Sequence, residues 1–275
     1  MESMTLDLAR PYPVDANQCA KYRRDGHILL QGVATPEDIE HYAPPILDLV
    51  EAHAKPRGVL VKPGESRPLY EYLANVWQKS EEIREFVFAR RFARIAAELM
   101  GVRAVRLYHD EAIVKEPGGS PSPWHKDHYN WPLATHQTIK MWLALADVRV
   151  EMAAIRYATG THHAAQFPEL PASYESNELF SRIIREHKIP IVSYAMKAGD
   201  ASFHSGGILH STLANTGSEP RQSISVIYFA DGAAVMTPNY EHRLVDMAEF
   251  LPGLVPGDLA ASALNPVLYS AEGKM

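Results

Sequence analysis

The sequence is poor in cysteine and has no long apolar run, and each shortage excludes a class of protein. Cys19 is the only cysteine among 275 residues, so an internal disulfide is excluded and no oxidising compartment is needed. No apolar stretch approaches the roughly 18 residues that cross a bilayer. The first residues contain neither a basic segment nor an apolar segment, so we expect no secretory signal and a soluble cytoplasmic protein.

The sequence also lacks an excess of positive charge. It contains 33 acidic against 27 basic residues, a formal net charge of −6. Surfaces that bind nucleic acid are basic and clustered, so we expect no nucleic-acid partner, and no membrane partner either. Hydrophobic residues make up 46% of the chain, which is ordinary for a globular protein with a sizeable core. We find no internal repeat and no signal for an oligomeric state.

The predicted elements come as helices first and then as many short strands. Asp15 and Thr35 are suitable N-caps for the first two helices, and Pro44-Pro45 should kink or interrupt the second. Another helical region, 80–99, ends before Gly101. One strand is predicted between the first two helices, at 27–33, and apolar strands separated by turns are predicted at 102–114, 139–148, 153–158, 189–195, 201–204, 208–212 and 222–230.

This order predicts a mainly β protein, a β-sandwich or jelly roll with an N-terminal layer of helices. We expect residues 1–275 to form a single domain. Within it we expect a helical layer over about 1–100, a β core over about 102–230 and a C-terminal extension over 231–275. Residues 164–188 form a polar insertion in the core, with a helix near 177–186.

The most informative stretch is Trp124-His125-Lys126-Asp127, which places a histidine and a carboxylate two positions apart. On an extended strand such residues point to the same side and can share one metal ion. Two histidines and one carboxylate on one face of an octahedron are the usual ligands of non-haem Fe(II). The pair alone is a weak signal in a chain with 13 histidines, so a third ligand is required.

His204 and His210 are the two candidates for that third ligand, and Arg221 helps to choose between them. A chelating keto acid with a distal carboxylate needs a fixed cation, and arginine binds carboxylates through two nitrogens. Arg221 follows His210 by one strand, a turn and the start of the next strand. The path from His204 is too long, so we interpret His204 as a core histidine or as a residue that supports a ligand.

The motifs together resemble a known family. The sequence reads Trp-His-x-Asp, then Gly-Asp-x-x-Phe-His from Gly199, then His-x-Thr-x-x-Asn from His210, then Arg221. This order resembles the phytanoyl-CoA dioxygenase (PhyH) family from about Tyr22 to Ala230. The family consists of oxygenases that use Fe(II), 2-oxoglutarate and O2 and have a double-stranded β-helix core, which is a cupin-like jelly roll.

The resemblance implies roles for individual residues. The metal ligands would be His125, Asp127 and His210. Arg221 and Thr212 would bind the distal carboxylate of 2-oxoglutarate. Trp142 stands where the family has a tryptophan beside this co-substrate, and Lys115 matches a recurrent lysine before the metal strand.

Other residues near these motifs lie outside the sets that would bind the metal and the co-substrate. His128, Tyr129 and Trp131 flank the metal strand and are candidates for substrate contacts, with ordinary packing as the alternative. Lys126 replaces a glutamine that is usual in the family. We interpret Asp110 and Glu111 as loop or surface acids, and His109, His136, His162 and His163 as structural histidines.

The resemblance implies a dioxygenase that oxidises a C–H bond of a small molecule and releases succinate and CO2. Related halogenases have glycine or alanine in place of the carboxylate ligand, so Asp127 argues for hydroxylation or a related oxidation. Two alternatives stay open. A cupin-like metal-dependent isomerase or hydrolase would not need Arg221 and Thr212, and a non-catalytic β-sandwich binding module would not need the three ligands.

Overall fold

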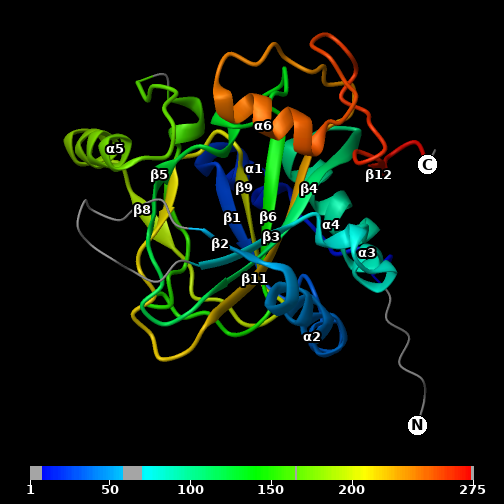
Figure 1. Ribbon diagram of the computed structural model, residues 1–275, viewed down its shortest axis with the longest axis horizontal. Helices are drawn as coiled ribbons and strands as arrows, with labels where there is room; N and C mark the ends of the chain where they lie inside the picture. Colours follow the sequence, from blue (N-terminus) through cyan, green and yellow to red (C-terminus); the bar gives the residue numbers. More distant parts are fainter. Residues whose placement is uncertain (1–7, 58–69, 165, 274–275) are drawn as a thin grey trace.

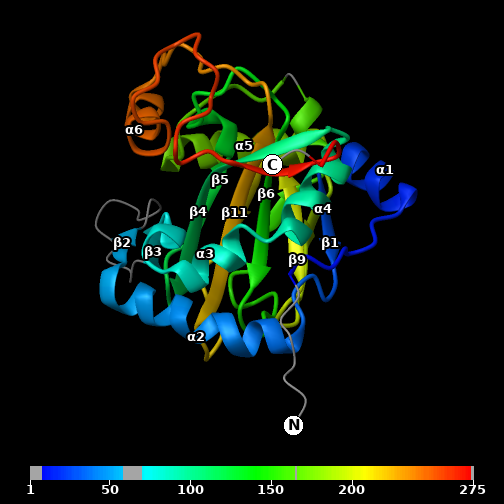
Figure 2. The ribbon, with the colours of Figure 1, turned by 90° about the vertical axis from the view of Figure 1, so that its right-hand side faces the viewer.

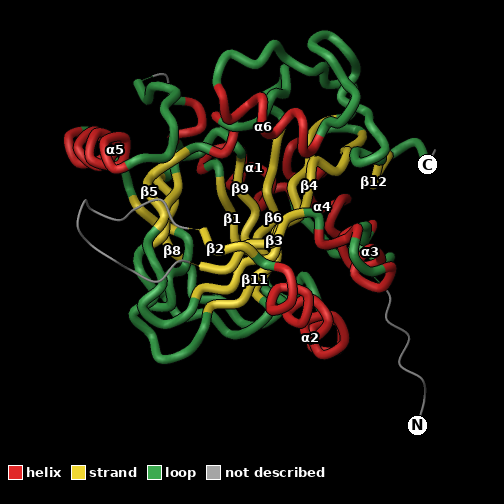
Figure 3. Tube along the Cα trace, viewed as in Figure 1, coloured by secondary structure: helices red, strands yellow, loops and turns green. Residues whose placement is uncertain are grey.

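The computed structural model describes residues 8–57, 70–164 and 166–273, which form two antiparallel sheets with helices outside them (Figures 1 and 3). The strands of the large sheet, in spatial order, are β1 (His27–Leu30), β9 (Ala201–Ser205), β6 (Thr138–Ala144), β11 (Arg221–Ala230), β4 (Ala104–Lys115), β3 (Tyr70–Ala74) and β2 (Lys55–Arg57), and β12 (Val267–Ser270) also pairs with β4. Those of the small sheet are β5 (Ser122–His125), β10 (His210–Thr212), β7 (Arg156–Ala158) and β8 (Ile191–Ser193).

Four N-terminal helices cover the outer face of the large sheet (Figure 2). They are α1 (Ala16–Asp25), α2 (Pro36–His53), α3 (Glu81–Val87) and α4 (Arg90–Met100). The first hundred residues are not purely helical, because they also supply β1, β2 and β3 to the large sheet. No helix in the described part of the chain has the length and apolarity needed to cross a membrane.

The two remaining α-helices lie at other edges of the sheets. In the predicted insertion, α5 (Tyr174–Glu186) packs Phe180 and Ile184 against Trp124 of β5 and against Leu209, which directly precedes β10. The C-terminal α6 (Glu241–Phe250) lies across one end of the large sheet, at the top of Figure 1. It packs with Tyr108 of β4 in a separate apolar cluster. The sequence did not lead us to expect α6.

Local sequence signals account for where the helices begin. Asp15 accepts a hydrogen bond from the Gln18 backbone at 2.8 Å, and the Gln18 side chain accepts one from the Asp15 backbone, so this N-cap is confirmed. Thr35 caps α2 in the same way. The predicted interruption at Pro44-Pro45 is wrong, because α2 continues to His53. The two prolines remove hydrogen bonds to carbonyls of exposed residues, where water can replace them.

Alternation along β6 separates an apolar core from a polar interior. Ile139, Met141 and Leu143 point outward into the cluster shared with the N-terminal helices. Lys140 and Trp142 point inward, toward the small sheet. Burial of these three outward side chains stabilises the fold by about 25 cal/mol for each Å² of apolar surface removed from water. This burial holds the helical layer on the sheet.

A β-bulge changes this alternation within β4. The pairing with β11 shifts between Ile227 and Tyr228, which leaves an extra residue at Tyr108. Before the bulge, Leu107 faces the helices, and after it, His109, Glu111 and Lys115 face the space between the sheets. Glu111 is only 6% exposed and Asp110 is fully buried, so their interpretation as loop or surface acids is wrong.

A turn before β9 depends on glycine. Gly199 has φ of +88°, and a Cβ there would collide with the carbonyl oxygen of Ala34. Gly232 has a similar φ of +93° but nothing near its missing Cβ. We therefore expect Gly199→Ala to lower the free energy of unfolding by about 3 kcal/mol, and Gly232→Ala by only about 1 kcal/mol. Urea unfolding measures both, and equal losses would show that the close approach to Ala34 has no cost.

Candidate active site

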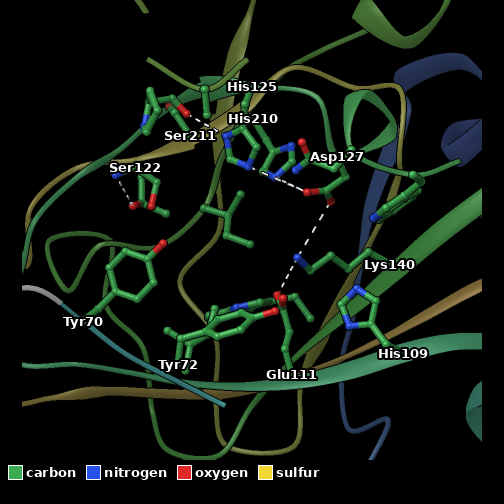
Figure 4. Close-up of a pocket in the computed structure, with 18 of the residues that line it drawn as sticks. Tyr70, Tyr72, His109, Glu111, Ser122, His125, Asp127, Lys140, His210 and Ser211 are labelled. Atoms are coloured by element: carbon green, nitrogen blue, oxygen red, sulfur yellow. Dashed lines mark hydrogen bonds and ion pairs between the residues drawn. The ribbon is translucent and has the colours of Figure 1, made fainter. Parts of the chain in front are cut away.

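Three of the predicted residues converge in the space between the two sheets. His125 is the last residue of β5, and His210, the first of β10, pairs directly with it across the small sheet. Asp127 follows on a 3₁₀ turn, η2 (Asp127–Tyr129), and not on a continuing strand as expected. Asp127 Oδ1 lies 3.7 Å from Nε2 of His125 and 3.7 Å from Nε2 of His210 (Figure 4). All three donor atoms lie within 4.8 Å of one another.

Hydrogen bonds at the far side of each imidazole orient both histidines. His125 Nδ1 lies 2.7 Å from the carbonyl of Pro123, and His210 Nδ1 lies 3.1 Å from the carbonyl of Ile208. A carbonyl only accepts, so each Nδ1 carries the proton and each Nε2 presents a lone pair to the centre. Two imidazole nitrogens and one carboxylate oxygen suit Fe(II). The residues present therefore fit the metal that the sequence predicts.

Opposing effects set the pKa of Asp127. Burial favours the neutral acid, but Lys140, His210, His204 and His125 together outweigh it and hold this pKa well below its usual value. Burial, followed by the neighbouring His125, lowers the pKa of His210 well below its usual value. The site thus presents a carboxylate and a neutral imidazole, which are the protonation states that ligate a metal.

The three donor groups open onto a cavity of about 230 Å³ between the sheets. One part of its wall carries Lys115, Trp142, Thr212 and Arg221, the residues expected to bind 2-oxoglutarate. Arg221 lies on β11 directly opposite Lys115 of β4, and its guanidinium lies 5.3 Å from the centre of the Trp142 ring.

Lys115 and Arg221 are two cations buried side by side. They are 1% and 3% exposed, and neither forms an ion pair with another described residue. Lys115 Nζ donates to the Thr212 hydroxyl at 2.8 Å, and Arg221 Nη1 donates to the Ala153 carbonyl at 2.8 Å. Arg221 Nε has no hydrogen-bond partner within the described part of the chain. Burial, and then the charge of Arg221, lower the pKa of Lys115 to about 6. An anion bound between the two side chains would favour the charged form of Lys115 and compensate the charge of Arg221, which makes this end of the cavity an anion site.

The three candidates for substrate contacts lie in two different places. Trp131 lines the cavity beside the metal ligands and also packs against Tyr108. His128 and Tyr129 line a second, smaller cavity together with His136 and Glu169. Only Trp131 therefore faces the space next to the candidate metal centre.

Sequence reasoning missed much of the opposite wall. Lys140 reaches from β6 toward Asp127 and pairs with Glu111 at 2.6 Å (Figure 4). His109, which we interpreted as structural, lines the cavity and stacks on Phe250 of α6 with ring centres 4.0 Å apart. The wall also includes Tyr70, Tyr72, Val245, Asp246 and Glu249.

Comparison with protein families gives a match over most of the chain. Residues 22–223 match the phytanoyl-CoA dioxygenase (PhyH) family. The chain belongs to this family. The resemblance noted in the sequence is thereby confirmed, over almost the range expected. A comparison with curated proteins gave no significant match.

Solved structures extend the comparison to the fold. The carbocyclase SnoK from nogalamycin biosynthesis is 25% identical, with a TM-score of 0.77 over 94% of this chain and 99% of that chain. The epimerase SnoN, in complex with Fe³⁺, alpha ketoglutarate and nogalamycin RO, is 27% identical, with a TM-score of 0.74 over 91% and 97%. EctD from S. alaskensis with bound Fe shares the fold at 18% identity, with a TM-score of 0.66 over 82% and 80%. The mainly β jelly-roll fold is therefore confirmed.

The buried Lys115 makes a prediction for the ligand-free protein. Its pKa is about 6 when folded and near 10.5 when unfolded, so between these pH values the unfolded chain binds more protons and stability rises with pH. Lys115→Met removes this cost. We expect the variant to melt several degrees higher than wild type near pH 6.5, with a difference that shrinks toward pH 10. Thermal melts across this range check the prediction, and a difference that grows with pH would contradict it.

Proposed function

We propose that the chain is an Fe(II)- and 2-oxoglutarate-dependent oxygenase that hydroxylates a C–H bond of a small molecule and releases succinate and CO2. The observation that carries this proposal is the pairing of two sites in one cavity. A His125–Asp127–His210 cluster suited to Fe(II) opens onto the same space as the buried cations Lys115 and Arg221. A keto acid with a distal carboxylate needs both parts.

The residues of the chain would hold and orient the reactants. His125, Asp127 and His210 would bind the metal on one side and leave its other positions open. Arg221 and Lys115 would bind the distal carboxylate of 2-oxoglutarate, and the Thr212 hydroxyl, which already accepts two hydrogen bonds, would donate to it. When bound, the metal and 2-oxoglutarate supply the reaction with O2, which the side chains cannot perform.

The substrate would enter next to the metal, on the side lined by Trp131, Glu111, His109 and α6. The solved relatives include a carbocyclase and an epimerase, so members of this fold catalyse more than one type of reaction. Asp127 supports hydroxylation over halogenation, because it fills the position that chloride would need. We further propose that residues 1–275 act as one domain, since the N-terminal helices share their core with the large sheet.

The first prediction from this proposal concerns binding. Purified protein given Fe(II) and 2-oxoglutarate without oxygen should develop a weak visible charge-transfer band. His210→Ala should abolish the band because a ligand is lost. Arg221→Met should weaken 2-oxoglutarate binding by about 10–100-fold, because charged hydrogen bonds of about 1.5–3 kcal/mol are removed. Titration of the band gives the affinity.

The controls separate this function from its alternatives. Gly232→Ala changes a surface turn remote from the cavity and should leave the band as in wild type. Iron uptake without a band would support a cupin-like isomerase or hydrolase, and no iron uptake would support a binding module. Once a substrate is found, product mass decides the reaction: hydroxylation adds one oxygen atom, ring closure removes two hydrogens, and epimerisation leaves the mass unchanged.

A further inference from the structure

The two oxygens of the Asp127 carboxylate face different surroundings. Oδ1 points at Nε2 of His125 and His210, where the metal would bind. Oδ2 points the other way, 3.5 Å from Nε2 of His204 and 3.8 Å from Nζ of Lys140 (Figure 4 shows the contact with Lys140). Oδ2 is buried, and neither it nor His204 Nε2 has a hydrogen-bond partner among the described residues, so these two contacts are electrostatic at the distances given. A carboxylate can bind a metal through one oxygen or two, so the surroundings of Oδ2 decide which mode is available.

The two residues that face Oδ2 lie together on the large sheet. Lys140 of β6 and His204 of β9 are directly opposite each other in the strand register, on the inner face. The two histidine ligands come from the small sheet, and Asp127 lies on the turn that follows it. The large sheet thus reaches the metal ligands through the far oxygen of Asp127 and through the ring of His204, whose centre lies 4.8 Å from that of His210.

A hydrogen-bond chain fixes the orientation of His204. The residue is fully buried, and its Nδ1 lies 3.4 Å from the hydroxyl of Tyr157, which itself lies 2.8 Å from the hydroxyl of Ser202. If Ser202 donates to Tyr157, then Tyr157 donates to His204 Nδ1. The His204 proton is then on Nε2, directed at Asp127 Oδ2.

Lys140 is held as firmly as His204. Its Nζ pairs with Glu111 at 2.6 Å, and both side chains are buried. The Glu111 carboxylate compensates the buried ammonium group and holds it near Oδ2, 3.8 Å away.

We propose that Lys140 and His204 are positioning residues that hold Oδ2 of Asp127 away from the metal, so that the carboxylate binds through Oδ1 alone. One coordination position is thereby kept open for a reactant. This inference rests on the metal site of the proposed function, but it requires neither 2-oxoglutarate nor a known substrate.

The test for His204 compares two substitutions of similar size. The Gln side chain in His204→Gln can place an amide N–H where Nε2 stands, whereas His204→Met offers no donor. We expect His204→Met to weaken Fe(II) binding by about 10–100-fold, the usual effect of losing a residue that orients a ligand, and His204→Gln to restore most of the affinity. Anaerobic competition with a coloured chelator measures both.

The test for Lys140 removes a balanced pair of charges. Lys140→Met alone would leave Glu111 buried without its partner, so the variant is Lys140→Met with Glu111→Gln. Asp110→Asn is the matched control. Asp110 is a buried acid on the same strand as Glu111, but its carboxylate accepts from the backbone of Val76 and faces away from the site. We expect the double variant to bind Fe(II) about tenfold more weakly, and the control to change the melting temperature but not the affinity.

A second measurement reports the binding mode itself. Mn(II) is a stable probe, and the relaxation of water protons counts the water molecules bound to it. With Oδ2 released, the carboxylate binds through both oxygens and displaces one water. We expect one fewer bound water in His204→Met and in the double variant than in wild type, His204→Gln and Asp110→Asn. A purely structural role would lower stability without changing this count.

Wild-type affinity and an unchanged water count in both His204→Met and the double variant would overturn the inference. Failure of wild type to bind Fe(II) or Mn(II) would overturn it together with the proposed function. Metal binding with the expected losses, but without a 2-oxoglutarate band, would support the inference and contradict only the proposed co-substrate.

Discussion

The space between the two sheets contains charged groups that are shut off from water, and the balance among these charges organises the protein. At one end, Asp127 and Glu111 share the cation Lys140, which compensates one of their two negative charges and leaves the other for a metal ion. At the other end, Lys115 and Arg221 have no counter-ion among the described residues. The described residues therefore supply the ligands for a metal cation but no counter-charge for Lys115 and Arg221. A dicarboxylate that binds the metal at one end and these two side chains at the other would supply that charge.

Short-range signals were sufficient for the N-terminal helices and for His125 and Asp127, two of the three residues that bind the metal in our proposal. Capping residues such as Asp15 and Thr35 act within a few positions of the chain, so their helices could be read directly. His125 and Asp127 are close in sequence and remain close in the fold, although a 3₁₀ turn and not a strand brings Asp127 inward. The spacing to Arg221 favoured His210 over His204, and the family resemblance added the roles of Lys115 and Thr212.

Long-range features could not be read in the same way. A regular strand would place Leu107, His109 and Glu111 on one face, but the bulge at Tyr108 moves the last two to the cavity. The partner of Glu111 is Lys140, two strands away in the sheet, and no local pattern links them. The helix α6 forms part of the cavity wall although it lies over a hundred residues after Asp127 in the chain. Its position across the large sheet is set by tertiary packing, which no local sequence pattern reveals.

The direct pairing of His125 with His210 has a consequence for how the small sheet is held in place. β10 contains only three residues, so few backbone hydrogen bonds fix its alignment with β5. A shift by one residue would turn His210 to the opposite face of the sheet and separate it from His125. A metal ion bound by both histidines would therefore lock the alignment of two segments that are far apart in the chain. Loss of the ion would loosen strand pairing as well as stop the chemistry.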